Sequence, residues 1–500
     1  MKTLAACILL SAAVLGTAAA AENAPKADPK GAFGAFQPSR AWTPPKDPKA
    51  LAKLAEWQDL KLGVLISWQP SVQWGLDSWP LVTTRHTWNQ RMNWPAGKPA
   101  PGADNDRAFQ QAYERLPLTF NPVKFDAGKW AAALKAGGVR YALAMTKHHD
   151  GFCLWDTKTT EYRITSPQYP FYADPRADTV KQICDALRKQ GLWAGVYFSK
   201  ADWNSPRYWL PELGPGANQG PNYNPAKQPE KWKNFKEFTW AQIAEIMTGY
   251  GKLDILWLDG GAVNARSGAG IDMAGMAAMA RGYQPGLIVV DRCCGGGYED
   301  YITPEGDHQM PQAFLPHPWE VCQTMGGHWN WFPDDSKFKS AATIIRNLCL
   351  VTARNGNYLL GIGPDANGEF APAVYERLAE LGRWLQVNGE AVYATRPLPP
   401  YEAGDCVFTQ RRDGSRYAII LPRTPDGGLP ESVTVPAGLA ANAVHVSLLG
   451  YGPLEPAVVK DGQAVIAIPA AARAKPPCKY AWALKFAPPA PTATTGGRTP

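Results

Sequence analysis

The sequence predicts a parallel (β/α)8 barrel of the TIM type, followed by a small antiparallel β-sandwich domain. From residue 62 onward, short apolar runs alternate with amphipathic helical patterns, as in βαβ units around a parallel sheet. Seven or eight such units favour a barrel over an open doubly wound sheet, because no glycine-rich phosphate loop follows the first strand. From about residue 391 the pattern changes to short alternating runs broken by Gly and Pro, which is typical of a sandwich.

The N-terminus has the pattern of a secretory signal peptide at residues 1–21. Lys2 opens a short positive region, residues 4–16 are apolar, and small residues at 17–21 form the cleavage signal. This segment is too short to span a membrane, and no later stretch has about 18 uninterrupted apolar residues. We therefore expect an exported chain, periplasmic or extracellular, without a membrane span.

Composition divides the rest of the chain into four parts. Residues 22–50 are a Pro/Lys-rich leader, residues 51–390 form the barrel, residues 391–487 form the sandwich, and residues 488–500 are a disordered tail. Strands are expected in the barrel at residues 63–67, 141–146, 192–198, 253–258, 287–290, 320–324 and 358–362, and in the sandwich at residues 417–421, 432–435, 444–448 and 464–468.

Helices are expected between the barrel strands. Trp130, Ala133 and Leu134 share one face of a predicted helix for which Asp126 is the candidate N-cap. The same spacing of apolar residues predicts two further helices, around residues 180–187 and 240–247.

Charge and cysteine content exclude some classes of protein. The 51 basic and 44 acidic residues give a formal charge of +7 that is spread along the chain, so binding of nucleic acid has little support. Twenty tryptophans suit an exported protein that presents flat apolar faces to sugars. The cysteines are scattered without C-x-x-C pairs, which favours buried free thiols, and Cys293-Cys294 is the one place where we would expect a bridge.

Polar side chains follow several of the predicted strands, at the face of a barrel that carries active sites. They are Lys147, His148, His149 and Asp150 after one strand, Tyr197 and Ser199 at the end of the next, then Asp259 and Asp291-Arg292.

Asp259 is the sharpest of these signals. It follows four apolar residues and precedes two glycines, so its carboxylate is expected at the mouth of the barrel; the alternative is a helix N-cap. His148 and His149 could form a metal pair, but adjacent residues at a strand end are expected to point to opposite sides, and no third ligand has zinc-like spacing. Hydrogen bonding to a polyol is the preferred interpretation of the two histidines.

Cleavage of a glycoside with retention requires two carboxyl groups roughly 5 to 5.5 Å apart. Asp259 can supply the nucleophile. The proton donor must come from a later loop, and position alone does not choose among the candidates, which are Glu299, Asp300, Glu305, Asp307 and Glu320.

Several motifs resemble those of glycoside hydrolase family 29, the retaining α-L-fucosidases, from about residue 57 to residue 396. The motifs are Phe120-Asn121-Pro122 with Lys124-Phe125-Asp126, Thr146-Lys147-His148-His149-Asp150-Gly151-Phe152, Asp254-Ile255-Leu256-Trp257-Leu258-Asp259-Gly260, Pro318-Trp319-Glu320 with Cys322, and Asn355-Gly356-Asn357 followed by Ile362-Gly363-Pro364. Because five such motifs occur in order at family-like spacing, the resemblance is specific.

The resemblance implies a role for each candidate residue. Asp259 corresponds to the nucleophile, Arg292 lies beside the acid/base, and Trp329 matches the aromatic residue that closes over the sugar. The remaining sugar-binding positions fall on Asp77, Trp79, His148, His149, Tyr197 and Trp257. The implied reaction is exo-hydrolysis of α-L-fucosides from a fucosylated oligosaccharide or glycoprotein glycan by double displacement, without metal or organic cofactor.

The acid/base is the least transferable residue of the family. Glu305 is preferred, because Thr303-Pro304-Glu305 resembles the Thr-Pro-Glu motif of many members; Asp307 and Glu320 are the alternatives.

One departure from the family pattern affects the first strand. The usual His-Trp-Gly is replaced by Ser67-Trp68-Gln69, which removes one imidazole from the sugar site. A lost hydrogen bond of this kind costs about 0.5 to 1.5 kcal/mol. The departure keeps two alternatives open, which are a non-catalytic fucose-binding protein and a glycosidase for a related sugar such as an α-L-galactoside.

Overall fold

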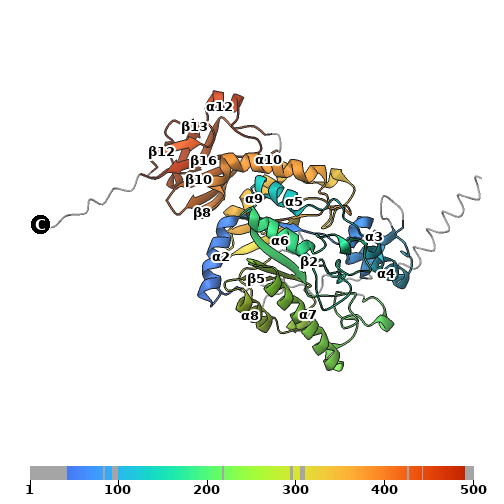
Figure 1. Ribbon diagram of the computed structural model, residues 1–500. Coiled ribbons are helices and arrows are strands. Elements are labelled where there is room, and N and C mark those ends of the chain that lie inside the picture. The colour runs from blue at the N-terminus through green and yellow to red at the C-terminus, as the bar shows by residue number, and fades with distance from the viewer. Residues whose placement is uncertain are drawn as a thin grey trace, which may run out of the picture.

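The barrel consists of a curled parallel sheet with helices outside it, and the C-terminal β domain packs against one side (Figure 1). The computed structural model describes residues 42–489 apart from residues 83–84, 93–98, 217–218, 293–296, 305–309, 425–426 and 442. The barrel strands are β1 (Leu62–Ile66), β2 (Tyr141–Lys147), β3 (Trp193–Ser199), β4 (Ile255–Asp259), β5 (Ile288–Asp291), β6 (Trp319–Thr324) and β7 (Gly356–Ile362).

All seven strands expected in the barrel are confirmed, each within two residues at either end. They pair in the order β5-β4-β3-β2-β1-β7-β6, and every pair is parallel. Almost all their side chains are buried, as expected where helices cover one face and the barrel interior fills the other.

The barrel sheet has seven strands in the described residues, in agreement with the seven or eight units that the sequence predicts. The place of an eighth strand, between β5 and β6, is taken by residues 300–302. Asp300 N donates to Val289 O at 2.8 Å on one side, and Glu320 N donates to Ile302 O at 2.9 Å on the other. Ile302 also forms a parallel bridge with Trp319. This segment therefore closes the gap with only a few ladder hydrogen bonds.

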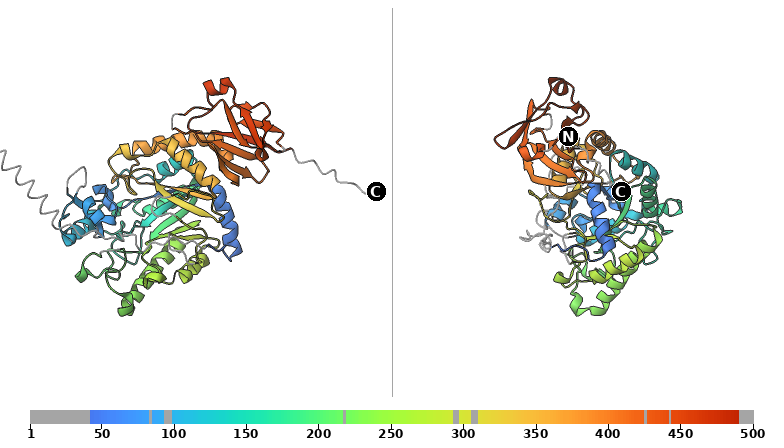
Figure 2. Two further views of the ribbon diagram at one scale, coloured as in Figure 1. Left: turned by 180° about the vertical axis from the view of Figure 1, so that it is seen from behind. Right: turned by 90° about the vertical axis from the view of Figure 1, so that its left-hand side faces the viewer.

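Helices surround the sheet, as the second view in Figure 2 also shows. Asp126 caps the helix that begins after it, because its side chain accepts a hydrogen bond from Lys129 N, and this confirms the predicted N-cap. The principal helices are α2 (Pro48–Leu60), α5 (Ala127–Ala136), α6 (Thr179–Lys189), α7 (Pro229–Gly249), α8 (Met273–Tyr283), α9 (Ala341–Ala353) and α10 (Pro372–Asn388), with α3 (Arg85–Met92) and α4 (Asp106–Glu114) in the connection after β1.

The C-terminal β domain contains a six-stranded and a three-stranded antiparallel sheet. The four strands expected there are confirmed as β10, β11, β12 and β15. The six-stranded sheet holds β8 (Thr395–Ala403), β9 (Cys406–Arg411), β10 (Arg416–Ile420), β12 (His445–Leu448), β13 (Gly452–Pro453) and β16 (Trp482–Ala487), and the smaller sheet holds β11 (Ser432–Pro436), β14 (Val458–Lys460) and β15 (Gln463–Ala467). The short helices α11 (Ala437–Ala440) and α12 (Ala470–Ala474) complete the domain.

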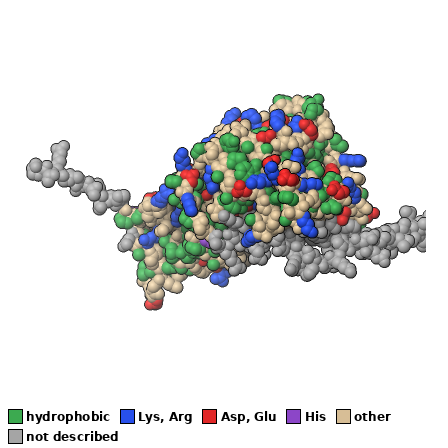
Figure 3. Space-filling model, turned by 90° about the horizontal axis from the view of Figure 1, so that it is seen from below, with side chains coloured by type: hydrophobic (Ala, Val, Ile, Leu, Met, Phe, Trp, Pro, Cys, Tyr) green, Lys and Arg blue, Asp and Glu red, His purple; other side chains and the backbone are tan. Residues whose placement is uncertain are grey.

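The two domains are joined by specific contacts. Trp384 Nε1, on α10, donates to Ala481 O at 2.8 Å, and Arg354 pairs with Glu402 on β8 at 2.6 Å. On the face drawn in Figure 3, basic and acidic side chains are interspersed, in agreement with the spread of charge along the sequence.

Six cysteines fall within the described residues, and none of those six is in a disulfide, as the sequence predicts; Cys293 and Cys294 lie outside the described residues. No helix in this part of the chain has both the length and the apolar character needed to cross a bilayer.

Candidate active site

Asp259 is the last residue of β4 and is almost completely buried at the carboxyl end of the barrel sheet. Tyr197, on the neighbouring β3, donates its hydroxyl to Asp259 Oδ2 at 2.8 Å, and Gly260 N donates to Oδ1 at 2.7 Å. Gly260 has a φ of 85°, and a Cβ there would lie 2.8 Å from Ala201 N. Only glycine fits this turn, which therefore holds the carboxylate in place.

The surroundings of Asp259 keep its carboxylate ionised. Burial by itself raises the pKa, but the Arg292 guanidinium, the His149 imidazole and the two hydrogen bonds outweigh burial and lower the pKa of Asp259 to about 2. Arg292 Nη1 lies 3.7 Å from Asp259 Oδ2. The site therefore presents a fixed, negatively charged carboxylate at neutral pH.

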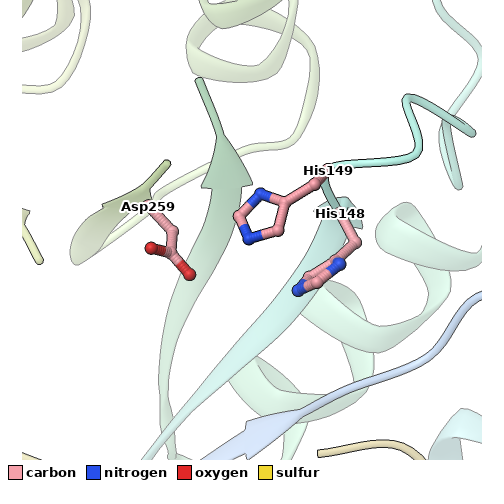
Figure 4. A group of neighbouring side chains, drawn as sticks. All are labelled: His148, His149 and Asp259. Carbon is pink, nitrogen blue, oxygen red and sulfur yellow. The ribbon is translucent and has the colours of Figure 1, made fainter. Parts of the chain in front are cut away.

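The two histidines lie side by side, and the expectation that they point to opposite sides is wrong. Their ring centroids are 4.1 Å apart, and both rings face the same space as Asp259 (Figure 4). The alternation rule fails because both residues follow the end of β2, whose register with β3 already shifts between Met145 and Lys147.

Hydrogen bonds to serine orient both imidazoles. Ser199 Oγ donates its proton to Ala201 O, so it must accept from His149 Nδ1, which lies 2.7 Å away. His149 Nε2 therefore carries a lone pair. His148 Nδ1 is hydrogen-bonded to Ser78 Oγ at 2.5 Å. Burial lowers the pKa of both histidines, that of His149 to about 4, so that both are neutral at pH 7.

Aromatic rings surround these polar groups. Tyr197 and Trp257 stack with centroids 5.5 Å apart, and Trp79 meets the His149 ring edge-on at 5.3 Å. The Arg292 guanidinium lies 5.7 Å from the centre of the Trp257 ring and 5.0 Å from that of Trp329. These contacts bring the predicted residues from β3, β4, the end of β5 and the loop after β6 into one site.

Asp77 lies in the loop before the short helix η2 (Trp79–Leu81). Its carboxylate accepts a hydrogen bond from Trp79 N at 2.9 Å, so it orders the loop that carries Trp79. Trp203 was not predicted, yet its ring lies 4.9 Å from that of His149 and 5.8 Å from that of Trp79. The high tryptophan content was the only sequence signal for it.

The residue before Arg292 belongs to a buried ion pair that the sequence analysis missed. Lys200 Nζ lies 2.6 Å from Asp291 Oδ1, neither side chain is exposed, and Tyr298 donates its hydroxyl to Asp291 Oδ2 at 2.6 Å. Lys200 directly follows β3, and Asp291 is the last residue of β5. Their positions at strand ends could have suggested the pair, but their distance apart in sequence concealed it.

Glu320 belongs to the interior of the barrel. Its carboxylate accepts hydrogen bonds from Tyr141 at 2.5 Å, Trp257 at 2.8 Å and Tyr301 at 3.0 Å, and the residue is fully buried near the start of β6. Burial raises its pKa to about 7 despite these bonds. This arrangement fixes the Trp257 indole beneath Tyr197 and favours a positioning role for Glu320 over that of the acid/base.

Glu320→Gln is expected to change how stability depends on pH. Folded Glu320 keeps its proton up to about pH 7, whereas an unfolded glutamate loses it near about 4.3, so the unfolding free energy of the natural chain falls as pH rises between these values. The variant cannot titrate there. The free energy of unfolding of the variant, relative to that of the natural chain, should therefore rise by on the order of 1 to 3 kcal/mol from about pH 4.5 to about pH 7.5. Urea denaturation of both proteins at the two pH values measures this change. A difference in unfolding free energy that is the same at both pH values contradicts the prediction.

Ser67 does not face the other site residues as a free donor. Its hydroxyl donates to Asn330 Oδ1 at 2.9 Å, and Asn330 Nδ2 donates to Leu76 O at 2.9 Å. Asn330 directly follows Trp329, and Leu76 directly precedes Asp77. Asn330 therefore ties the loop that carries Trp329 to the loop that carries Asp77, and Ser67 holds the Asn330 amide in place.

Asn330→Ala is expected to weaken substrate binding more than the chemical step. It removes the hydrogen bonds to Ser67 and Leu76 from the loop that carries Trp329, which costs about 1 to 2 kcal/mol of binding free energy. KM should therefore rise roughly 5- to 30-fold, with a smaller change in kcat. Ser67→Ala removes one bond and is the matched control, with about half the effect on free energy. Equal losses in kcat and kcat/KM for Asn330→Ala contradict this interpretation.

Glu305 and Asp307 lie outside the described residues. The last described residues before them, Thr303 and Pro304, continue the segment that closes the barrel. This segment runs parallel to β6, so it leads toward the carboxyl ends of the strands, where Asp259 lies.

Comparison with known proteins decides the family. The family model described as Alpha-L-fucosidase matches residues 33–390, which is more than half of the chain. The chain belongs to the alpha-L-fucosidase family. It is a glycoside hydrolase, and its activity is that of the family, the hydrolysis of α-L-fucosides.

Individual relatives agree with this family. The human tissue alpha-L-fucosidase is 26% identical over 478 residues, which cover 90% of this chain and 92% of the relative. Among solved structures, alpha-L-fucosidase isoenzyme 1 from Paenibacillus thiaminolyticus has a TM-score of 0.71 at 24% identity, covering 88% of this chain and 99% of that one. An alpha-L-fucosidase of family GH29 from Bacteroides thetaiotaomicron also has a TM-score of 0.71, at 21% identity. The match covers 90% of this chain and 98% of that one. These two structures show the same fold.

Proposed function

We propose that the barrel releases terminal α-L-fucose from glycans by double displacement, with Asp259 as nucleophile and Glu305 as acid/base. The observation that carries the proposal is the Asp259 carboxylate, which is buried, ionised and fixed by two hydrogen bonds at the carboxyl end of β4. A buried charge without a catalytic or ionic role is costly. The family membership of the chain identifies the sugar that this carboxylate meets.

In the first step, an Asp259 oxygen attacks the anomeric carbon while the acid/base protonates the leaving oxygen. The Asp259 charge is lost as the new bond forms. Tyr197 and Gly260 hold the carboxylate in one orientation, so little reorganisation accompanies the attack. The second step reverses these roles, as the deprotonated acid/base activates water to hydrolyse the fucosyl-enzyme.

Glu305 is supported as the acid/base by its place in the chain. It follows directly on the segment that closes the barrel and leads toward the carboxyl ends of the strands, and its main rival, Glu320, accepts three hydrogen bonds within the barrel interior. A proton donor needs a carboxyl group that reaches the leaving oxygen.

The side chains around Asp259 suit a deoxy sugar. The His149 Nε2 lone pair can accept a hydrogen bond from a sugar hydroxyl, because its Nδ1 donates to Ser199. Trp329, which is partly exposed, provides apolar surface for the carbon face and methyl group of fucose, as aromatic rings commonly do for apolar groups, whereas Trp257 is fully buried and supports Tyr197 from behind. We further propose that the substrate is a fucosylated oligosaccharide or glycoprotein glycan, and that the signal-like segment at residues 1–21 directs the enzyme out of the cytoplasm.

The proposal is tested by incubating the protein with 4-nitrophenyl α-L-fucoside and, in parallel, the α-L-galactoside. Release of 4-nitrophenol from the fucoside, with α-L-fucose as the first anomer seen by NMR, supports it. Preferential turnover of the galactoside would reassign the sugar and trace it to the Ser67 departure. Fucose binding without turnover of either compound would indicate a sugar-binding protein.

A further inference from the structure

The side chains of His148, His149 and Asp259 surround one point in the site, as Figure 4 shows. One potential ligand atom from each, an imidazole nitrogen or a carboxylate oxygen, lies within 4.8 Å of those of the other two, and all three residues are buried. In a tetrahedral zinc site with bonds of about 2.0 to 2.1 Å, neighbouring ligand atoms are about 3.3 Å apart. The three ligand atoms must therefore approach one another when they bind an ion. Within the described residues, this is the one such group of three.

The two imidazoles are already oriented as metal ligands. In metal sites the ring nitrogen that does not bind the ion usually holds a second hydrogen bond, which fixes the ring and its tautomer. Here Ser199 and Ser78 hold the two Nδ1 atoms. Because Ser199 Oγ accepts from His149 Nδ1, the Nε2 of His149 carries the lone pair that a metal ion requires.

The charge of the group also suits a divalent ion. Two neutral imidazoles and one carboxylate form the donor set that Zn²⁺ and other late transition metals take when one position remains open. Arg292 opposes a cation, since its Nη1 lies 3.7 Å from Asp259 Oδ2. We therefore expect weaker binding than in a dedicated structural zinc site, at a place where no metal is needed for the reaction.

We propose that His148, His149 and Asp259 bind Zn²⁺, and that zinc and sugar exclude each other from the site. An ion held there occupies the His149 lone pair and an Asp259 oxygen, so the same atoms cannot contact a fucoside. Zinc binding stands on the geometry alone. Its consequence, inhibition that is competitive with substrate, rests on the proposed function.

The direct test is calorimetric titration of ZnCl₂ into the full-length protein after removal of metals with EDTA. We expect one ion per chain, and we expect saturating L-fucose to suppress this binding. Asp259→Asn and His149→Ala should each weaken it at least about 10-fold. Ser199→Ala, which leaves all three ligands in place but frees the His149 ring, should weaken it about 10-fold as well. His445 is an exposed residue on strand β12 of the other domain, so His445→Ala is the matched control and should bind zinc unchanged.

The outcomes separate the two proposals. Zinc binding that survives in both ligand variants places the ion elsewhere and overturns the site. Zinc binding that these variants weaken but that L-fucose leaves unaffected overturns only the exclusion of the sugar by zinc. Circular dichroism shows whether each variant is folded, and Asp259→Asn, which conserves side-chain volume, provides the test if His149→Ala fails to fold. If zinc binds to the three residues but no fucoside is hydrolysed, the metal site stands and the proposed function fails. If zinc raises KM for the fucoside without changing kcat, both the metal site and the proposed function stand.

Discussion

Asp259→Ala is expected to reduce turnover of 4-nitrophenyl α-L-fucoside by at least about 10⁴-fold. The variant lacks the carboxylate that we propose as the nucleophile. Glu320 is not placed to replace it, because its carboxylate accepts three hydrogen bonds inside the barrel. The assay is initial-rate release of 4-nitrophenol. Added azide should restore part of the rate and give β-L-fucosyl azide, since a small anion then attacks from the vacated side.

The fold should tolerate this change. Alanine removes a buried charge together with its hydrogen bonds from Tyr197 and Gly260, so we expect only a modest shift of the melting temperature. Asp272→Ala, which alters the capping carboxylate of surface helix α8, is the matched control and should keep full activity. Turnover of the Asp259 variant within 10-fold of the natural rate, by a protein free of natural enzyme, would refute the assignment of the nucleophile.

Glu305→Ala is expected to have the second-largest effect, and the effect should depend on the leaving group. A fucosylated oligosaccharide leaves as a poor alkoxide and needs protonation, so its turnover should fall about 10²- to 10⁴-fold. 4-Nitrophenolate leaves without help, so formation of the fucosyl-enzyme from the aryl fucoside should be much less affected. Azide should then intercept this intermediate and give α-L-fucosyl azide, the opposite anomer to that from the Asp259 variant.

The rivals are tested in the same assays. Asp307→Ala and Glu320→Gln should show no dependence on leaving group and no azide product. If Glu305→Ala reduces turnover of both substrates equally, while Asp307→Ala reduces turnover of the oligosaccharide far more than that of the aryl fucoside, Asp307 is the acid/base instead.

Local sequence patterns predicted the barrel strands well because each is a short apolar run that is buried on both sides. The Asp126 cap was equally predictable, since a helix N-terminus leaves backbone N–H groups that a nearby carboxylate can satisfy. Asp259 could be identified for a related reason: a carboxylate between a buried strand and a glycine turn has few structural roles.

Contacts between residues that are distant in sequence could not be predicted in this way. Lys200 and Asp291 form their buried pair across 91 positions, and the Ser67 hydroxyl bonds to Asn330 across 263. Neither partner has a local pattern that indicates the other. The segment that fills the eighth barrel position was not located from the sequence, because residues 300–302 are held by hydrogen bonds to two neighbouring strands and do not form a periodic apolar run of their own.

The sequence by itself determined the order of strands and helices, the nucleophile candidate and the resemblance to α-L-fucosidases, since these depend on short-range periodicity and motifs. Only the tertiary structure decided that His148 and His149 face Asp259 together and that Glu320 supports Trp257 from within the barrel. The physical reason is that side-chain direction beyond a strand end, and the pairing of buried polar groups, are set by packing against elements far away in the chain.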